Sequence, residues 1–337
     1  MRGVIIGILL IIGLSITGVG YWLFVSPNVK AAKQLTIKIP TGSSFKDVLR
    51  ILRQNHALKD ELSFELVSKL KKYDRHVLPG NYVLRSNMNN RQIVNLLKFG
   101  WQTPVKLVIY NMRTKEDFAG LVGRTLELDS VTLLEKFNDQ TFCENYGLDT
   151  NTILSRFIVD NYEFYWNTSL EKFVTKMEEG YNAFWNEERK GQANALNMTL
   201  AQITTLASIV EKEVIFDKEM PTVAGVYLNR IRIGMPLQAD PTLVFALRDF
   251  DTRRVTQYHK DFNSPYNTYM YAGLPPGPIC MPRKKSIDAV LNAQWHQYLY
   301  FCANPDMSGY SIFSKTYDDQ MKVAAQYRKK LNQMNIH

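Results

Sequence analysis

The chain has 337 residues, of which 45% are hydrophobic and 22% charged, so it can build a sizeable core and is not expected to be disordered. Its net charge of +9 suits an acidic partner such as nucleic acid, anionic lipid or an anionic cell-wall polymer. The basic residues are scattered without an arginine-rich arm or nucleic-acid motif, which argues against nucleic acid. Cys143, Cys280 and Cys302 lack CxxC spacing, so we expect neither a zinc site nor a disulfide framework.

The N-terminus begins with a long apolar run. Residues 3–25 carry no charge and exceed the about 20 residues that span a bilayer core. A cleaved signal peptide would instead have an apolar region of about 7–15 residues. Tyr21 and Trp22 stand at the outer end of the run, where interfacial anchors are typical. We therefore predict an uncleaved transmembrane anchor over residues 1–25. The flanking basic residues are too few to decide its orientation.

A small α+β module is predicted at 35–102, after a short linker at 26–34. Apolar residues alternate as in a strand and then recur at helical spacing, and the same sequence of patterns is repeated. The expected order is a strand at 35–39, helices at 45–52 and 61–72, a strand at 82–84 and a helix at 93–97. The module contains no constellation of catalytic residue types. It is either a spacer or a carbohydrate-binding module.

The larger domain, at 103–337, is expected to be mixed α+β. A strand at 103–112 opens it, a mainly helical stretch follows at 115–160, and an amphipathic helix with Phe173 and Met177 on one side comes next. The aromatic segment at 162–168 is read either as core or as a platform for sugar rings. Near the C-terminus the patterns predict a hairpin with strands at 298–303 and 310–313, then a basic helix at 318–333.

A predicted helix at 200–214 ends in two carboxylates. On a helical wheel Glu211 and Glu213 lie at opposite edges of the apolar face, about 160° apart. The apolar surface extends past Glu213 through Ile209, so Glu213 is expected to be the more desolvated carboxylate. Desolvation raises a carboxyl pKa and suits it to act as an acid near neutral pH. The alternative is that both glutamates are simply solvated at a helix end.

The segments that follow carry further polar groups. Asp240 precedes Pro241, which suggests either an N-cap with proline at the first helical position or a direct part in a site. The stretch 266–279 is rich in Asn, Gly and Pro, so it is predicted to be a rigid irregular loop. Tyr266, Asn267 and Thr268 in this loop could hydrogen-bond the hydroxyl and N-acetyl groups of a sugar.

Five motifs in this order resemble the endolytic murein transglycosylase (YceG-like) family. They are ASIVEKE at 207–213, LNRIRIGMPLQADPT at 228–242, YNTY at 266–269, GLPPGPI at 273–279 and YLYF at 298–301. The resemblance covers nearly the whole chain, including the N-terminal anchor and the small module, which looks LysM-like. The sequence departs from the family pattern at 166–169 (WNTS) and at 318–320, so the resemblance assigns no role to those outer positions.

The resemblance implies a lyase that cuts peptidoglycan glycan strands between N-acetylmuramic acid and N-acetylglucosamine. It implies Glu213 as the single acid/base, with Glu211 as the alternative, and an anhydro-ended product. Gln238, Tyr266 and Asn267 are the candidates for holding the sugar. No cofactor is expected, since no lysine has a context suited to a pyridoxal phosphate Schiff base.

The resemblance also implies an enzyme fixed in the plasma membrane by its N-terminal helix, with the catalytic domain on the outer side and peptidoglycan synthases as candidate partners. Two other functions stay open from the sequence. One is a non-catalytic glycan-binding scaffold of a cell-wall synthesis complex. The other is a true hydrolase that pairs Glu213 with Asp240, because two-carboxylate glycosidases use such a pair.

Overall fold

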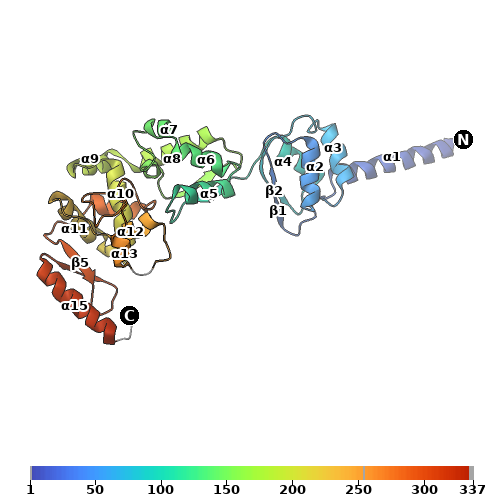
Figure 1. Cartoon of the computed structure of the whole chain (residues 1–337). Coiled ribbons are helices and arrows are strands. Elements are labelled where there is room, and N and C mark those ends of the chain that lie inside the picture. The colour runs from blue at the N-terminus through green and yellow to red at the C-terminus, as the bar shows by residue number, and fades with distance from the viewer. Residues whose placement is uncertain (1, 253–254, 334–337) are drawn as a thin grey trace. The chain divides into compact units, whose positions relative to one another are not determined.

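The computed structural model describes residues 2–252 and 255–333, and the fold is mixed α+β, as predicted (Figure 1). Helix α1 (Arg2–Phe24) occupies the apolar N-terminal run, and within the described residues its segment Val4–Phe24 is the one stretch long and apolar enough to cross a membrane. The chain divides into two compact units. The first comprises Met1–Leu107, Val122–Leu128 and Tyr162–Ser169, and the second comprises Val108–Leu121, Asp129–Asn161 and Leu170–His337.

In the first unit, the predicted order of strand, two helices and strand is confirmed. The elements are β1 (Gln34–Ile39), α2 (Phe45–Gln54), α3 (Glu61–Leu70), β2 (Gly80–Arg85) and α4 (Asn90–Lys98). Strands β1 and β2 pair antiparallel, with Gln34 opposite Arg85 and Ile39 opposite Gly80. Ser44 begins α2 with a capping box that it forms with Asp47.

The predicted linker at 26–34 is part of this unit rather than a spacer. Asn28 and Val29 are buried, and Val29 forms an isolated β-bridge with Leu58. The Asn28 side chain also donates a 2.7 Å hydrogen bond to the carbonyl of Asp60. The local sequence suggested a linker. It could not reveal these contacts, because they join residues about thirty positions apart.

The middle of the chain begins with β3 (Val105–Val108), which pairs with β4 (Asn161–Phe164). The predicted helical stretch between them holds α5 (Lys115–Thr125), α6 (Ser130–Asn138), α7 (Gln140–Glu144) and the 3₁₀ helix η1 (Ile153–Arg156). Tyr162, Phe164 and Trp166 of the aromatic segment are at most 9% exposed, whereas Tyr165 is 55% exposed. The core interpretation therefore holds for three of these four aromatic side chains.

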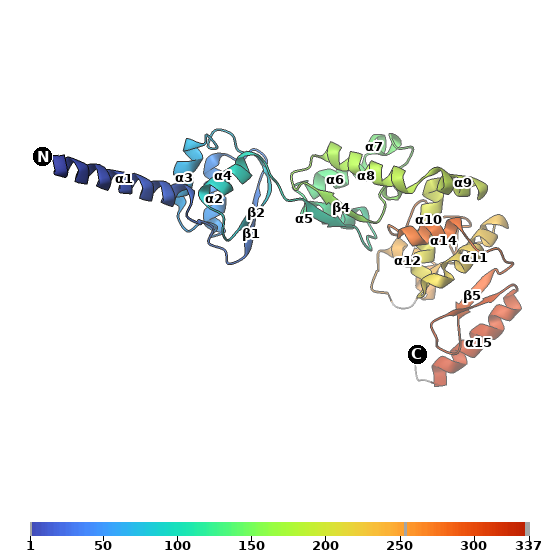
Figure 2. The ribbon, with the colours of Figure 1, turned by 180° about the vertical axis from the view of Figure 1, so that it is seen from behind.

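The rest of the second unit surrounds one buried helix, α10 (Leu200–Glu213), which packs against α11 (Met220–Arg232) and α14 (Lys284–Leu291) (Figure 2). Phe173 and Met177 of helix α8 (Leu170–Phe184) are fully buried, as their spacing predicted. The predicted C-terminal hairpin forms, and its strands pair antiparallel. The remaining elements are α9 (Glu187–Ala195), η2 (Asp217–Glu219), α12 (Asp240–Leu247), α13 (Gln257–Lys260), β5 (Tyr300–Ala303), β6 (Ser311–Ser314) and α15 (Tyr317–Gln333).

Candidate functional site

Helix α10 positions the site. Thr199 begins it with a capping box, accepting from the Gln202 amide while its own amide donates to the Gln202 side chain. All residues from Ile203 to Val210 are buried, so the helix is fixed along its length. It ends at Glu213, where Val214 turns to an extended conformation. The last turn therefore presents three charged side chains from a rigid support.

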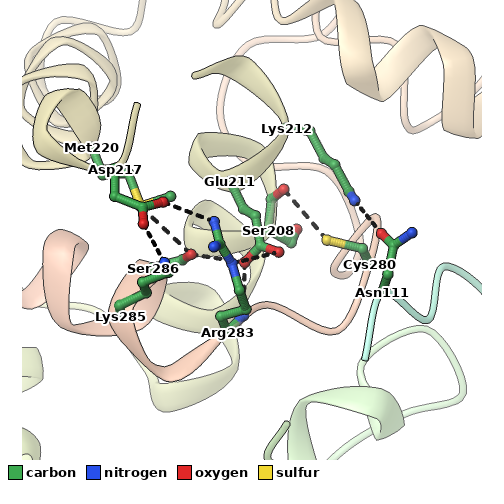
Figure 3. A network of polar contacts seen from close by, with 10 residues as sticks. All are labelled: Asn111, Ser208, Glu211, Lys212, Asp217, Met220, Cys280, Arg283, Lys285 and Ser286. Atoms are coloured by element: carbon green, nitrogen blue, oxygen red, sulfur yellow. Dashed lines mark hydrogen bonds and ion pairs between the residues drawn. The ribbon is translucent and has the colours of Figure 1, made fainter. Parts of the chain in front are cut away.

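Glu211 is engaged in holding helix α14 (Figure 3). One oxygen of its carboxylate accepts from the Arg283 amide and from the Ser286 hydroxyl, both at 2.7 Å. The other oxygen pairs with the Arg283 guanidinium at 3.2 Å, and the Glu211 side chain is only 9% exposed. A carboxylate at the N-terminus of a helix also complements its dipole. Glu211 thus ties two helices together, and its lone pairs are committed to that task.

Ser208 and Lys212, also on α10, each hold a neighbouring segment of the chain (Figure 3). The Ser208 hydroxyl accepts from the Ile279 amide at 3.0 Å, which fixes the end of the GLPPGPI segment against α10. The Lys212 ammonium donates to the Asn111 side chain at 2.7 Å. Gly277 in the same segment packs closely on a backbone carbonyl, since an added Cβ would lie 2.2 Å from the Asn151 oxygen.

Glu213 points to a different neighbour from Glu211, as the wheel predicted. Its carboxylate accepts a 3.0 Å hydrogen bond from the hydroxyl of Tyr227, a buried residue of α11. Desolvation raises the pKa of the Glu213 carboxyl to about 7, an effect that the Tyr227 hydrogen bond opposes and the nearby Asp240 carboxylate reinforces. With a pKa near neutral pH, both the protonated and the ionised form of Glu213 are populated. Glu213 can therefore both give and take a proton under physiological conditions.

Two cavities meet at Glu213. One, of about 270 Å³, is lined by Arg113, Lys212 and a group of apolar side chains that includes Val244, Phe245 and Phe250. The other, of about 440 Å³, is lined mainly by aromatic and polar groups, among them Tyr227, Arg230, Gln238, Tyr269 and Tyr300. Glu213 and Asp240 line both cavities. A long ligand could thus occupy both cavities with one bond held over Glu213.

Asp240 lies in the site, and its predicted role as an N-cap is wrong. The structure places Ala239 at the N-cap position of α12 and Asp240 inside the helix as its first residue. The Asp240 carboxylate is exposed and accepts a 2.5 Å hydrogen bond from the Tyr269 hydroxyl. Pro241 still occupies the first turn, as expected from its missing amide hydrogen.

Of the other four predicted substrate residues, Gln238 is exposed in the larger cavity, whereas Tyr266, Asn267 and Thr268 are engaged in contacts within the protein. Gln238 is exposed, has φ of 51° and lines the larger cavity. Tyr266 packs on Phe245, with ring centroids 4.8 Å apart. Asn267 is fully buried, and its side chain donates to the carbonyls of Lys260 and Phe262 and accepts from the amides of Tyr269 and Met270. Thr268 is buried against the Ala239 amide and the Thr242 hydroxyl.

Thr268 therefore holds the segment that carries Gln238, just before Asp240, whereas Asn267 braces the turn around itself. Their direct contact with a sugar, like that of Tyr266, stays a prediction. The loop at 266–279 is irregular throughout, as its composition predicted.

The sequence analysis missed Tyr227 and Arg230, which lie three residues apart on one face of α11. Arg230 is 6% exposed, and its guanidinium donates to the carbonyls of Leu299 at 2.7 Å and Leu237 at 2.6 Å. Its charge also opposes the rise in the pKa of Glu213. The sequence did offer one signal for these two residues, since a tyrosine and an arginine three positions apart lie on the same face of a predicted helix. Within residues 2–252 and 255–333, no group of three or more His, Cys, Asp or Glu side chains is placed to hold a metal ion.

Known proteins of one kind match this sequence over most of its length. A protein of Bacillus subtilis (strain 168) named endolytic murein transglycosylase is 27% identical over 315 residues, which cover 89% of this chain and 86% of the relative. A protein of Streptococcus pneumoniae (strain D39) with the same name is 25% identical, and the match covers 90% of this chain but 60% of that longer relative.

A solved structure supports the same relationship. The crystal structure of a YceG-like protein from Listeria monocytogenes matches with a TM-score of 0.59 and 28% identity, covering 87% of this chain and 99% of that one. The model of the YceG-like family matches residues 37–326. Because this match spans far more than half of the sequence, the protein belongs to the YceG-like family.

Proposed function

We propose that this protein is an endolytic murein transglycosylase, which cuts peptidoglycan glycan strands between N-acetylmuramic acid and N-acetylglucosamine. Relatives from Bacillus subtilis and Streptococcus pneumoniae bear that name. The observation that carries the proposal is the state of Glu213, a carboxyl with a pKa of about 7 at the junction of two cavities. Glu211, the alternative acid, is committed to Arg283 and Ser286.

The proposed chemistry uses one carboxyl group twice. Glu213 first protonates the glycosidic oxygen, and the bond from that oxygen to C1 of the muramic acid breaks with oxocarbenium character. The resulting carboxylate then takes the proton of the sugar's own C6 hydroxyl as that oxygen bonds to C1. The product is a 1,6-anhydro ring, and Glu213 regains its proton without consuming water. A pKa near 7 suits both steps, since it matches the working pH.

The shape of the site fits cleavage inside a strand. An endolytic enzyme must hold sugars on both sides of the broken bond, and Glu213 with Asp240 stands between two cavities. Arg113 and Lys212 line one of them. Their positive charges suit the carboxylates that muramic acid and its peptides carry. Gln238 and the Tyr269–Asp240 pair line the other side and are our candidates for orienting the sugar.

The remaining parts of the chain serve delivery in this proposal. Helix α1 anchors the protein in the plasma membrane, and the rest lies on the outer side, where the substrate is. Residues 35–102 form a LysM-like module, supported by the β1–α2–α3–β2 order and the antiparallel pairing of its strands. Residues 103–337 form the catalytic domain. Peptidoglycan synthases are the proposed protein partners.

The test is mass spectrometry of purified peptidoglycan after digestion. Wild type is expected to release anhydro-ended muropeptides, and Glu213→Gln is expected to release none, because glutamine cannot exchange the proton. Glu188→Gln makes the same chemical change at an exposed position of α9 and serves as the matched control.

The products also distinguish the other two functions. Reducing ends that disappear in Asp240→Asn would identify a hydrolase using Glu213 and Asp240. Strand binding without any cleavage by the wild type would identify a glycan-binding scaffold.

A further inference from the structure

We infer that helix α3 carries a membrane-docking ridge, formed by Leu62, Leu66 and Leu70, that rests on the surface of an anionic bilayer. The inference rests on the proposed membrane anchor in α1. The three leucines are 59%, 39% and 65% exposed. Because they lie four residues apart, they form one stripe along the helix. Phe64, which lies opposite the stripe, and Val67 beside it are fully buried, so the module's core accounts for those side chains and not for the leucines.

The end of α1 is fixed beside this ridge. Leu23 and Phe24 pack against the core of the module. The Asn90 side chain donates both to the Leu23 carbonyl at 3.0 Å and to the Ser63 hydroxyl at 2.9 Å. Ser63 lies on α3, about 60° around the helix from Leu66. The ridge therefore flanks the point where α1 leaves the module.

The module is held rigidly at that point. Val29 is 1% exposed and bridges to Leu58, so the chain after α1 enters the module directly. In both views of the chain α3 lies at the end of the module nearest α1, while β1 and β2 lie toward the other end (Figures 1 and 2). Helix α3 therefore lies close to the membrane surface when α1 spans the bilayer, and our inference turns its exposed leucines toward that surface.

The chemistry of the surroundings suits lipid headgroups. Tyr21 and Trp22 are 60% and 39% exposed at the end of α1, where aromatic residues mark the interface. Lys71 and Lys72 follow Leu70 directly, and their charges favour anionic lipid. The two acidic side chains of α3 are neutralised, Glu61 by Arg53 and Glu65 by Lys69, each at 2.7 Å. An apolar stripe with basic residues at its end is typical of helices that lie in the interface.

The experiment uses the full chain in nanodiscs that contain phosphatidylglycerol. An environment-sensitive fluorophore is attached at Leu66→Cys, with Cys302→Ser in the background because that cysteine is partly exposed. We expect quenching by lipids with a nitroxide near the headgroup and protection from aqueous iodide. Thr36→Cys on the outer face of β1 is the control, and iodide should quench it freely. A label at Leu14→Cys in α1 reports on the anchor through lipids with a nitroxide at the chain centre.

The outcomes separate the two proposals. Lipid quenching at position 66 that is lost with Leu62→Ser and Leu70→Ser, both exposed positions, supports the ridge. Quenching at position 14 with free iodide access at position 66 overturns the ridge and keeps the anchor. Protection at position 66 without lipid quenching assigns the ridge to a protein contact, such as a second copy, and overturns membrane docking. Absence of quenching at position 14 overturns the anchor and the ridge together.

Discussion

Replacing Tyr227 by phenylalanine should move the pH dependence of the reaction while leaving the fold intact. The substitution deletes the hydroxyl that donates to the Glu213 carboxylate at 3.0 Å. The ring keeps its edge-to-face contact with Phe301, whose centroid is 5.9 Å away. The hydrogen bond stabilises the ionised form of Glu213, so its loss raises the pKa of that carboxyl above about 7.

The size of the shift follows from the bond that is lost. A hydrogen bond to a charged group contributes about 1.5–3 kcal/mol, and one pH unit corresponds to about 1.4 kcal/mol. Because Glu213 is partly exposed, we expect the lower end, a shift of about one pH unit. The assay is the pH profile of kcat/KM on uncrosslinked glycan strands. Its alkaline limb reports the protonated acid in the free enzyme, and it should move to higher pH.

Tyr271→Phe is the matched control, since its hydroxyl bonds to Asn263 instead of Glu213. Its alkaline limb should coincide with that of the wild type. An unchanged or acid-shifted limb in Tyr227→Phe, with the fold preserved, would refute the assignment of that limb to Glu213.

Three further predictions concern stability. The free energy of unfolding of the wild type should fall by about 3 kcal/mol relative to Glu213→Gln as pH rises from about 4.5 to about 7. The reason is that Glu213 holds a proton in the folded protein that it releases in the unfolded chain over this range. If urea unfolding gives the same difference between the two proteins at pH 5 and at pH 8, the prediction is contradicted. Glu211→Gln should lower the free energy of unfolding by about 2 kcal/mol or more and still form anhydro ends below its melting temperature, so a stable but inactive variant would argue for Glu211 as the acid. Gly277→Ala should lower the free energy of unfolding by about 1–3 kcal/mol, because the added Cβ meets the carbonyl of Asn151. Gly191→Ala, in open space within α9, should raise it by about 0.5–1 kcal/mol. Equal effects of the two substitutions in calorimetry would exclude the clash at Gly277.

The sequence predicted what depends on local periodicity. The spacing of apolar residues placed α10 almost to the residue, and the rigid period of a helix separated Glu211 from Glu213. These two facts favoured Glu213 as the acid, and Glu211 stayed the alternative. Strand alternation likewise located β1, because a pleated backbone alternates its side chains, and two short apolar runs located the strands β5 and β6 of the hairpin.

Contacts between distant segments were beyond the reach of these patterns. Arg230 was overlooked because its partners include the carbonyl of Leu299, sixty-nine positions away. Asn267 was predicted to meet a sugar because its amide can bond in several directions, yet its partners are backbone groups within seven residues of it. Asp240 was expected either to cap a helix or to take part in the site, and its carboxylate bonds to Tyr269, which the loop brings back to it. Asn267 and Asp240 were singled out from the sequence and Arg230 was not, and for none of the three did the sequence name the hydrogen-bond partner.

Digestion in ¹⁸O-labelled water tests the central claim most directly. If Glu213 protonates the glycosidic oxygen and then directs the sugar's own C6 hydroxyl to C1, no solvent oxygen enters the product. Wild type should yield anhydro-ended fragments without ¹⁸O, and Glu213→Gln should yield no fragments. Reducing ends that carry ¹⁸O, or undiminished cleavage by Glu213→Gln, would contradict the proposed mechanism.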